Sequence, residues 1–277
     1  MNNWLNPLDI KKPKLIYLDT WVYRFLIDNK KYIPKMFEYL KTNILFPTIS
    51  DIIFIELNQH SEYHKKLNAL LPILNSVVVR NAEYILNEEV RNYPKIFNES
   101  IMYPNSFLLS HLFSSTIMEN LSSEYLTNEW KDFRGYANQM ERKICEVLYN
   151  YPKGKNGRYS KEQAEDFVYI LTIQWLSQTH PKFIASTLKS DTTNFVKTEV
   201  FKTLQLFAFY IFYKYYIGKR KVKKISDFGD LFHLFYIPYS EIAILEKDQC
   251  SILQKIQNDY KICKTVKIKN IDFIKSL

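Results

Sequence analysis

The chain has 277 residues, 47% of them hydrophobic, and is long enough to bury a large core as a globular protein. Its formal net charge of +9 favours anionic partners, nucleic acid before acidic membrane, although lysine- and asparagine-rich chains are often basic without a functional reason. Glycine occurs only 5 times, and no GxGxxG or GxxxxGK[ST] motif is present, so dinucleotide-binding and P-loop mechanisms have no sequence support.

Cysteine content and apolar runs predict a cytoplasmic protein without a membrane segment. The three cysteines are an odd number and form no CxxC motif, so neither a disulfide framework nor a cysteine zinc site is expected, and a reducing compartment fits. Residues 1–13 lack the apolar core of a signal peptide. The most apolar run, 204–213, is too short to span a bilayer and is bracketed by Lys202 and Lys214.

The first third of the chain predicts strands that alternate with helices. Buried strands are expected from the apolar runs at 15–19, 44–49 and 77–79. The expected helices are 20–41, with a break allowed at Pro34, then 51–60 with Ser50 as its N-cap, and 82–93.

The middle of the chain predicts helices only. Apolar residues between 126 and 147 alternate at spacings of four and three, which indicates a long helix with a heptad stripe. A basic loop follows at 152–158, and Ser160 with Gln163 forms a capping-box pattern for a helix through residue 175. These features predict a helical hairpin packed on itself or on the domain, with a dimer seam as the alternative.

The last third returns to alternating strands and helices. A helix with one apolar face is expected at 195–217, followed by the basic run 219–224. The next expected elements are a helix at 227–236 capped by Ser226, a strand at 241–245, a helix at 247–256 and a strand at 265–268. Strands alternating with helices at both ends of the chain favour a parallel sheet with helices on both faces.

Acidic residues fall where such a sheet would gather them. Asp19 and Glu246 end two predicted strands, Glu56 lies about two turns into the helix after the second strand, and Asp227 and Asp230 share one face of a later helix. Carboxylates brought together take up protons or bind a cation. Oxygen ligands of this kind suit Mg²⁺ or Mn²⁺, and two such ions can activate water against a phosphodiester.

Three segments resemble the PIN-like nuclease family. Residues 15–20, LIYLDT, look like its first motif, an apolar strand that ends in Asp, and residues 47–57, PTISDIIFIEL, look like its second, with a helical Glu. Residues 226–246, SDFGDLFHLFYIPYSEIAILE, are the most specific, because they resemble the Asp helix, the Tyr-Leu-Pro-Tyr corner and the next strand. The resemblance implies metal-dependent cleavage of RNA, or sometimes DNA, leaving a 5′-phosphate.

The same resemblance implies the fold and the site. The expected fold is α/β, a three-layer α/β/α arrangement with a central, mostly parallel sheet, formed by a single domain over 1–277 with a helical insertion at 96–190. The family usually ends its later strand with Thr-Asp, whereas this chain has Leu245-Glu246, so Asp248 is a substitute ligand, directly or through water. The expected catalytic residues are Asp19, Glu56, Asp230 and Glu246, and the expected metal ligands are Asp19, Glu56, Asp227, Asp230, Glu246 and Asp248 for Mg²⁺ or Mn²⁺. Lys219, Arg220, Lys221, Lys223 and Lys224 are expected to bind nucleic acid, with a solvated turn as the alternative.

Competing interpretations stay open at this point. The first is a nuclease that acts mainly on RNA, as a toxin or defence effector with a regulatory protein partner. The second is a catalytically degenerate PIN-like scaffold that binds nucleic acid or protein, which the Leu245-Glu246 departure favours. The third is a helical interaction protein whose acids are incidental. His233 is expected to pack beside the site, with contact to an acid or a phosphate as the alternative. The oligomeric state is left open.

Overall fold

A computed structural model of the chain describes residues 12–50, 52–53, 56, 61–99, 101, 151, 153, 159–187, 199–218 and 230–277. The predicted helix at 126–147, nearly all of the basic loop at 152–158, the basic run 219–224 and Asp227 lie outside these described residues.

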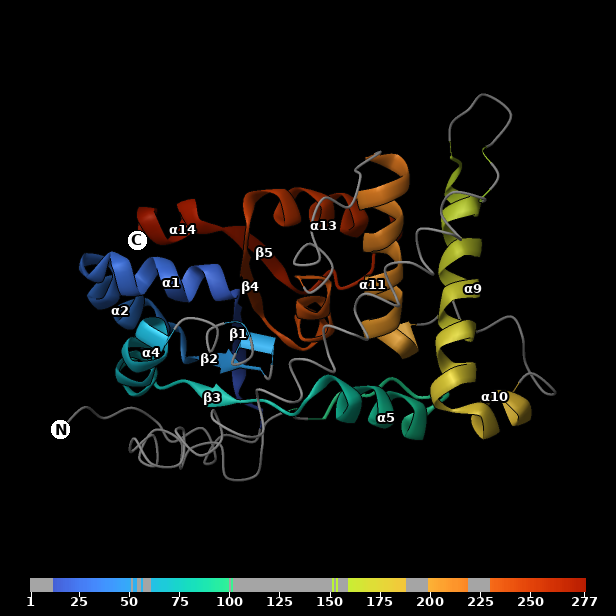
Figure 1. The fold of residues 1–277 in the computed structure, drawn as a ribbon, viewed down its shortest axis with the longest axis horizontal. Coiled ribbons are helices and arrows are strands. Elements are labelled where there is room, and N and C mark those ends of the chain that lie inside the picture. Colours follow the sequence, from blue (N-terminus) through green and yellow to red (C-terminus); the bar gives the residue numbers. More distant parts are fainter. Residues whose placement is uncertain are drawn as a thin grey trace.

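A five-stranded parallel sheet forms the centre of a mixed α/β fold, as predicted (Figure 1). Its strands are β1 (Lys14–Leu18), β2 (Leu45–Ile49), β3 (Val77–Val78), β4 (Ile242–Leu245) and β5 (Lys267–Asn270), in the spatial order β3-β2-β1-β4-β5. Every residue of β2 and β4 is buried, and so is every residue of β1 after Lys14. Strands covered on both faces need apolar side chains on both, which is why these segments are continuous apolar runs.

One face of the sheet is covered by α1 (Thr20–Asp28), α2 (Ile33–Asn43) and α4 (Ser61–Ile73) (Figure 1). The predicted helix over 20–41 is broken, but not at Pro34 as the sequence suggests. The chain leaves helical geometry earlier, at Asn29. The backbone N–H and the side-chain amide of Asn29 both donate to the carbonyl of Phe25 at 2.9 Å and close the end of α1. Pro34 lies in the first turn of α2, where its missing N–H costs nothing.

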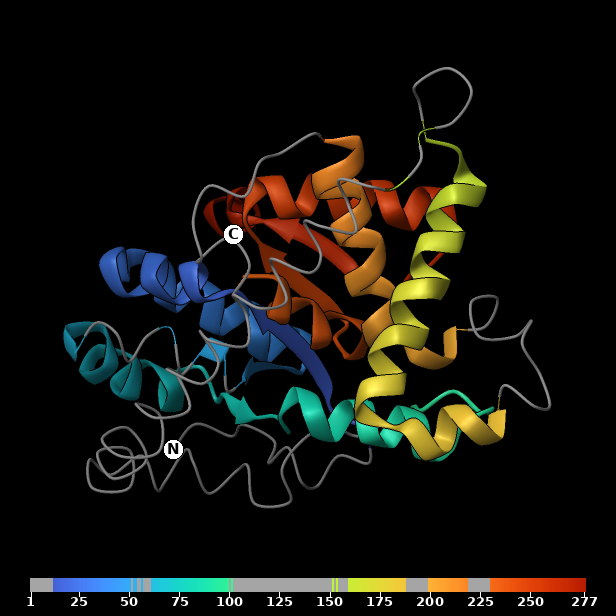
Figure 2. The same cartoon turned by 45° about the vertical axis from the view of Figure 1, so that its right-hand side comes forward.

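The opposite face is covered by α11 (Lys202–Ile211) and α13 (Lys247–Tyr260). The sequence predicts one apolar face for the first of these helices, but all ten residues of α11 are buried, because neighbours surround it. One neighbour is α9 (Lys161–Thr179), which lies outside it in Figure 2 and begins with the predicted capping box of Ser160 and Gln163. After α11 the chain continues as a π-helix, η6 (Phe212–Ile217).

The segment after the basic run is tighter than predicted. An α-helix is expected over 227–236, but the described part forms the 3₁₀-helices η7 (Asp230–Phe235) and η8 (Ile237–Tyr239). The sequence pattern also does not predict three helices, namely α4, α10 (Pro181–Thr187) and α14 (Ile271–Ser276).

In the described ranges, no helix is both long enough and apolar enough to cross a membrane. The single domain and the insertion at 96–190 stay predictions.

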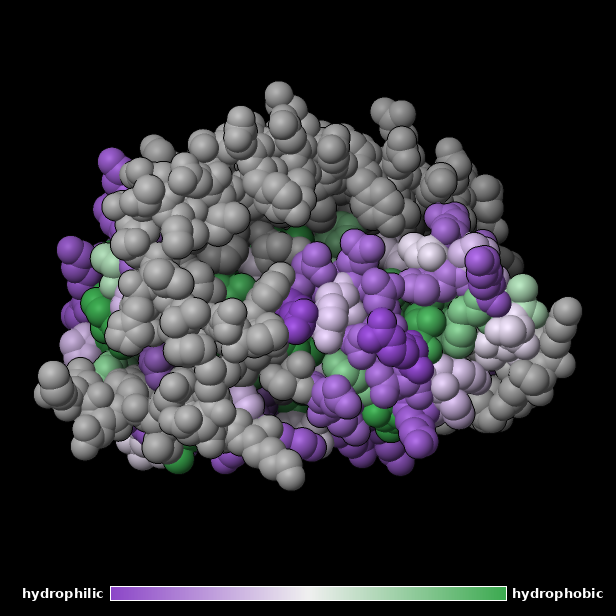
Figure 3. Space-filling view, turned by 90° about the horizontal axis from the view of Figure 1, so that it is seen from below, coloured by the Kyte–Doolittle hydropathy of each residue, from purple (hydrophilic) through white to green (hydrophobic). Residues whose placement is uncertain are grey.

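The edge of the molecule beyond β3 is formed by α5 (Ala82–Asn92) and, beside it, η5 (Glu199–Phe201). Figure 3 shows this side, where the surface over α5 is mostly hydrophilic. The other side of α5 turns Ile85, Leu86 and Glu89 into the interior. A carboxyl group is therefore buried far from the edge where the sequence predicts the site.

Candidate metal centre

The candidate site lies where the order of strands reverses. From β1 the chain builds β2 and β3 on one side and later adds β4 and β5 on the other. Open α/β sheets bind ligands beyond the carboxyl ends of the strands at such a switch point. The residues that follow β1 and β4 there are Asp19 and Glu246. The backbone N–H of Asp19 donates to the carbonyl of Ile244 at 3.1 Å, which holds the two strand ends together.

Asp19 is a buried acid at the junction of β1 and α1, with only 6% of its surface exposed. It serves as the N-cap of α1, because its Oδ1 accepts a hydrogen bond from the backbone N–H of Trp21 at 3.3 Å. Burial raises the pKa of Asp19, and the negative charge of Glu56 raises it further, whereas His233 opposes this rise. A carboxylate in this position gains from a nearby cation.

Glu56 approaches from the helical segment after β2, of which Ile52, Ile53 and Glu56 are described. The predicted N-cap Ser50 is in place, because its Oγ accepts from the backbone N–H of Ile53 at 3.4 Å. Desolvation opposes ionisation of Glu56, but His233 and Arg24 outweigh it and leave its pKa below the ordinary value. The lowered pKa of Glu56 favours its carboxylate form.

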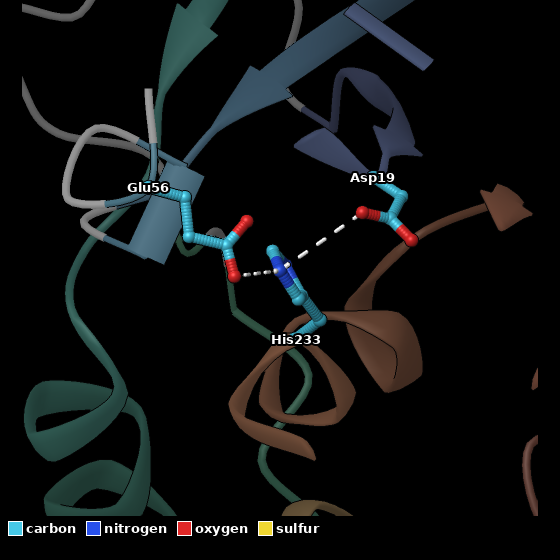
Figure 4. Close-up of side chains that lie close together, drawn as sticks. All are labelled: Asp19, Glu56 and His233. Atoms are coloured by element: carbon cyan, nitrogen blue, oxygen red, sulfur yellow. Dashed lines mark hydrogen bonds and ion pairs between the residues drawn. The ribbon is translucent and has the colours of Figure 1, made fainter. Parts of the chain in front are cut away.

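His233 lies between the two acids, as Figure 4 shows. It belongs to η7 and is 1% exposed. Its Nε2 is 3.2 Å from Oε1 of Glu56 and 4.0 Å from Oδ1 of Asp19. The alternative kept open for this residue, contact with an acid, is therefore confirmed, and His233 belongs in the site that the sequence predicts from acids alone.

Tyr17 fixes the other side of the imidazole. Its hydroxyl is hydrogen-bonded to Nδ1 of His233, and the two rings meet edge to face with centroids 5.9 Å apart. Tyr17 is fully buried and stacks on Tyr236 with centroids 5.8 Å apart and an interplanar angle of 3°. The ring of His233 is thus positioned by packing as well as by hydrogen bonds.

Glu246 stands at the exposed rim of the same cluster. Desolvation raises its pKa, the negative charges of Asp19 and Glu56 raise it further, and Lys214 lowers it. The charges of both inner acids and of the half-buried Lys214 of η6 therefore act on Glu246, which is not one of the three residues whose ligand atoms lie within 4.8 Å of one another. Sequence reasoning missed Lys214, because nothing in the local pattern distinguishes it from a lysine that ends an apolar run.

The remaining predicted ligands are placed less closely. Asp248 lies half-buried in the first turn of α13 and contributes to the raised pKa of Glu246. Asp230 begins η7, three residues before His233. Residues three apart in a 3₁₀-helix lie on the same side, so the backbone of Asp230 is on the side of η7 that carries His233. The predicted ligand Asp227 and the predicted nucleic-acid-binding residues at 219–224 are outside the described part of the chain.

Asp19, Glu56 and His233 are suited to holding a metal ion. Each offers one ligand atom, and the three atoms lie within 4.8 Å of one another. Two carboxylate oxygens and one imidazole nitrogen are a ligand set that divalent cations accept.

A scan against protein-family models found no match, and searches of curated proteins and of solved structures also found none.

Proposed function

We propose that this chain is a divalent-metal-dependent nuclease of PIN-like architecture that hydrolyses phosphodiester bonds, with RNA favoured over DNA. The observation that carries the proposal is the convergence of Asp19 and Glu56, from two separate elements, at the switch point of a parallel sheet. Bringing a buried carboxylate and a partly buried one close to each other is costly unless a counter-charge lies nearby. A bound cation supplies that charge.

The residues of the site divide the work by position. Asp19 and Glu56 would hold the cation, which would supply activation of a water molecule and stabilisation of the leaving oxygen. Glu246 stays at the exposed rim, where its raised pKa suits it to hold or take up a proton near the scissile phosphate. Lys214 lies close enough to affect Glu246 and brings positive charge toward a phosphate backbone.

An exposed aromatic side chain two residues after Asp19 supports a nucleic acid as the substrate. Trp21 follows Asp19 in the first turn of α1 and is 38% exposed. Its ring centroid is 6.0 Å from that of Phe25, over which the Lys275 ammonium lies at 5.9 Å. An exposed indole next to a second ring that itself has a cation over it suits an unpaired base, because base stacking on aromatic side chains is favourable for every base.

One specific observation favours the degenerate scaffold as a second candidate. Because His233 contacts both inner acids, its protonated imidazole would neutralise part of their charge without a metal. In that case the cluster is a buried ion network, and the basic chain binds nucleic acid or protein without cutting it. Metal-dependent cleavage separates the two candidates.

The test is cleavage of labelled single-stranded RNA, tRNA and DNA with Mn²⁺, with Mg²⁺ or with a chelator. Asp19→Asn and Glu56→Gln are expected to abolish cutting, because each replaces a negatively charged cation ligand with a neutral amide of nearly the same shape. Glu162→Gln is the matched control, since Glu162 is an exposed acid in the first turn of α9. Cleavage that survives both site variants, or that needs no metal, contradicts the proposal, and wild-type protein that binds substrate but never cuts it favours the scaffold.

The biological setting stays a prediction. A toxin or defence role and a regulatory protein partner rest on the family resemblance, and the cytoplasmic location on the sequence pattern.

A further inference from the structure

His233 brings a nitrogen donor into a site that the sequence predicts as purely carboxylate. We propose that Nε2 of His233 binds the metal directly, together with one oxygen each from Asp19 and Glu56, and that the centre therefore takes a first-row transition ion such as Mn²⁺ in preference to Mg²⁺. This inference rests on the metal site of the proposed function, whose ligand set and metal class it specifies, and does not depend on turnover.

The distances around Nε2 are those of ligands that share one ion. Nε2 is 3.2 Å from Oε1 of Glu56 and 4.0 Å from Oδ1 of Asp19. With metal–ligand bonds of about 2.1 Å, two ligands at right angles are roughly 3.0 Å apart and two opposite ligands roughly 4.2 Å apart. Both distances fall within this range. The three ligand atoms lie within 4.8 Å of one another, so a small inward movement of the side chains lets them reach a common ion.

The strand that precedes Asp19 also carries the residue that aims the imidazole. Tyr17 lies in β1, two residues before Asp19. The Tyr17 hydroxyl is hydrogen-bonded to Nδ1 of His233, which leaves Nε2 as the nitrogen that faces the acids. With Nε2 as a metal ligand, Nδ1 would carry the ring proton and donate it in a hydrogen bond to the Tyr17 oxygen. Metal-binding histidines commonly use their second nitrogen in this way.

An imidazole ligand changes which ions the site prefers. Mg²⁺ favours carboxylate and water oxygens and dehydrates reluctantly, whereas first-row transition ions accept imidazole nitrogen. Because His233 is buried, a bound Mg²⁺ would have to leave its Nε2 unused or accept it as a poor ligand.

The competing explanation is a protonated His233 that acts only as a counter-charge for the two carboxylates. The two explanations differ in one respect. A ligand nitrogen is in direct contact with the bound ion, whereas an imidazolium nitrogen carries a proton and cannot coordinate.

The decisive measurement is pulsed electron paramagnetic resonance of Mn²⁺ bound to the whole wild-type chain. Coupling to a histidine nitrogen is expected, and it is expected to change when histidine is labelled with ¹⁵N. The coupling should vanish in His233→Gln and persist in His180→Gln, the control at a histidine that instead bonds to Asn87 on α5. Tyr17→Phe retains His233 but removes its orienting hydrogen bond, and is expected to weaken Mn²⁺ binding by about tenfold to a hundredfold.

Titration calorimetry completes the test. Wild type is expected to bind Mn²⁺ at least about tenfold more tightly than Mg²⁺, and His233→Gln is expected to lose most of that ratio. Bound Mn²⁺ without histidine coupling overturns the inference but leaves an all-carboxylate nuclease standing. Coupling without cleavage of any substrate upholds the ligand set and overturns the nuclease. If His233→Gln does not fold, the absence of a ¹⁵N-sensitive histidine coupling in Mn²⁺-bound wild type still overturns the inference.

Discussion

Replacing Glu89 by glutamine is expected to stabilise the protein above pH 7, and the size of the effect follows from the burial of this acid. Glu89 lies on α5 with 0% of its surface exposed. Its Oε1 accepts hydrogen bonds from the backbone N–H of Thr203 at 3.1 Å and from the Tyr239 hydroxyl at 2.6 Å, and its Oε2 accepts one from the Thr203 hydroxyl. Despite these three donors, burial raises the pKa of Glu89 to about 7.

The direction of the pH dependence follows from proton binding. Between the ordinary pKa of 4.5 and about 7, native Glu89 keeps a proton that the unfolded chain has already lost. The native state binds more protons over this range, so its stability falls as the pH rises through it. At about 1.4 kcal/mol for each pKa unit, the loss above pH 7 amounts to roughly 3 kcal/mol. Glutamine has the shape of the protonated acid and does not titrate.

Urea unfolding of wild type and Glu89→Gln between about pH 4.5 and 8 measures the difference. The variant is expected to match wild type at the acidic end and to become more stable by roughly 3 kcal/mol at the basic end. Glu83→Gln, at an exposed acid in the first turn of α5, serves as the control and should follow the wild-type curve. A difference that does not change with pH, or wild type being the more stable at pH 8, refutes the reasoning.

Three further predictions test separate parts of the molecule. Ser160→Ala removes the 3.1 Å hydrogen bond to the Gln163 N–H and should cost about 1 kcal/mol in urea unfolding, which Ser160→Thr should largely avoid. Trp21→Ala should weaken binding of single-stranded RNA by about 5- to 100-fold and leave duplex binding almost unchanged, as measured by fluorescence anisotropy. Asp19→Asn should retain the fold, because asparagine also caps helices, and in thermal unfolding should lose the stabilisation that Mn²⁺ gives to wild type.

The parts of the site that the sequence predicts are those set by short-range patterns. A parallel strand buried on both faces is a continuous apolar run, and the residue after it emerges at the ligand-binding edge. This reasoning located β1, β2 and β4, and with them Asp19, Glu56 and Glu246. It works because the end of a strand is a local feature and the meeting of strand ends follows from the parallel topology.

The role of His233 depends on a contact that no local pattern contains. Its partner Tyr17 is 216 residues away, and their meeting requires β1 and η7 to be packed together first. The 3₁₀ geometry of η7 was equally hidden, because an apolar segment before a proline is also compatible with an α-helix. The missed α14 is only six residues long, too short for a helical period to show.

The Tyr-Pro-Tyr corner at 236–239, one of the segments that resemble the PIN-like family, connects the candidate site to the core. Tyr236 stacks on Tyr17 and so supports the hydrogen bond that orients His233. Tyr239, three residues later, donates to the buried Glu89. Because η8 joins the two tyrosines in a single tight turn, the ring that orients the imidazole and the hydroxyl that satisfies the buried acid are fixed relative to each other. The corner therefore contributes to the site without supplying a ligand of its own, because Tyr236 holds Tyr17 in place and Tyr17 orients His233.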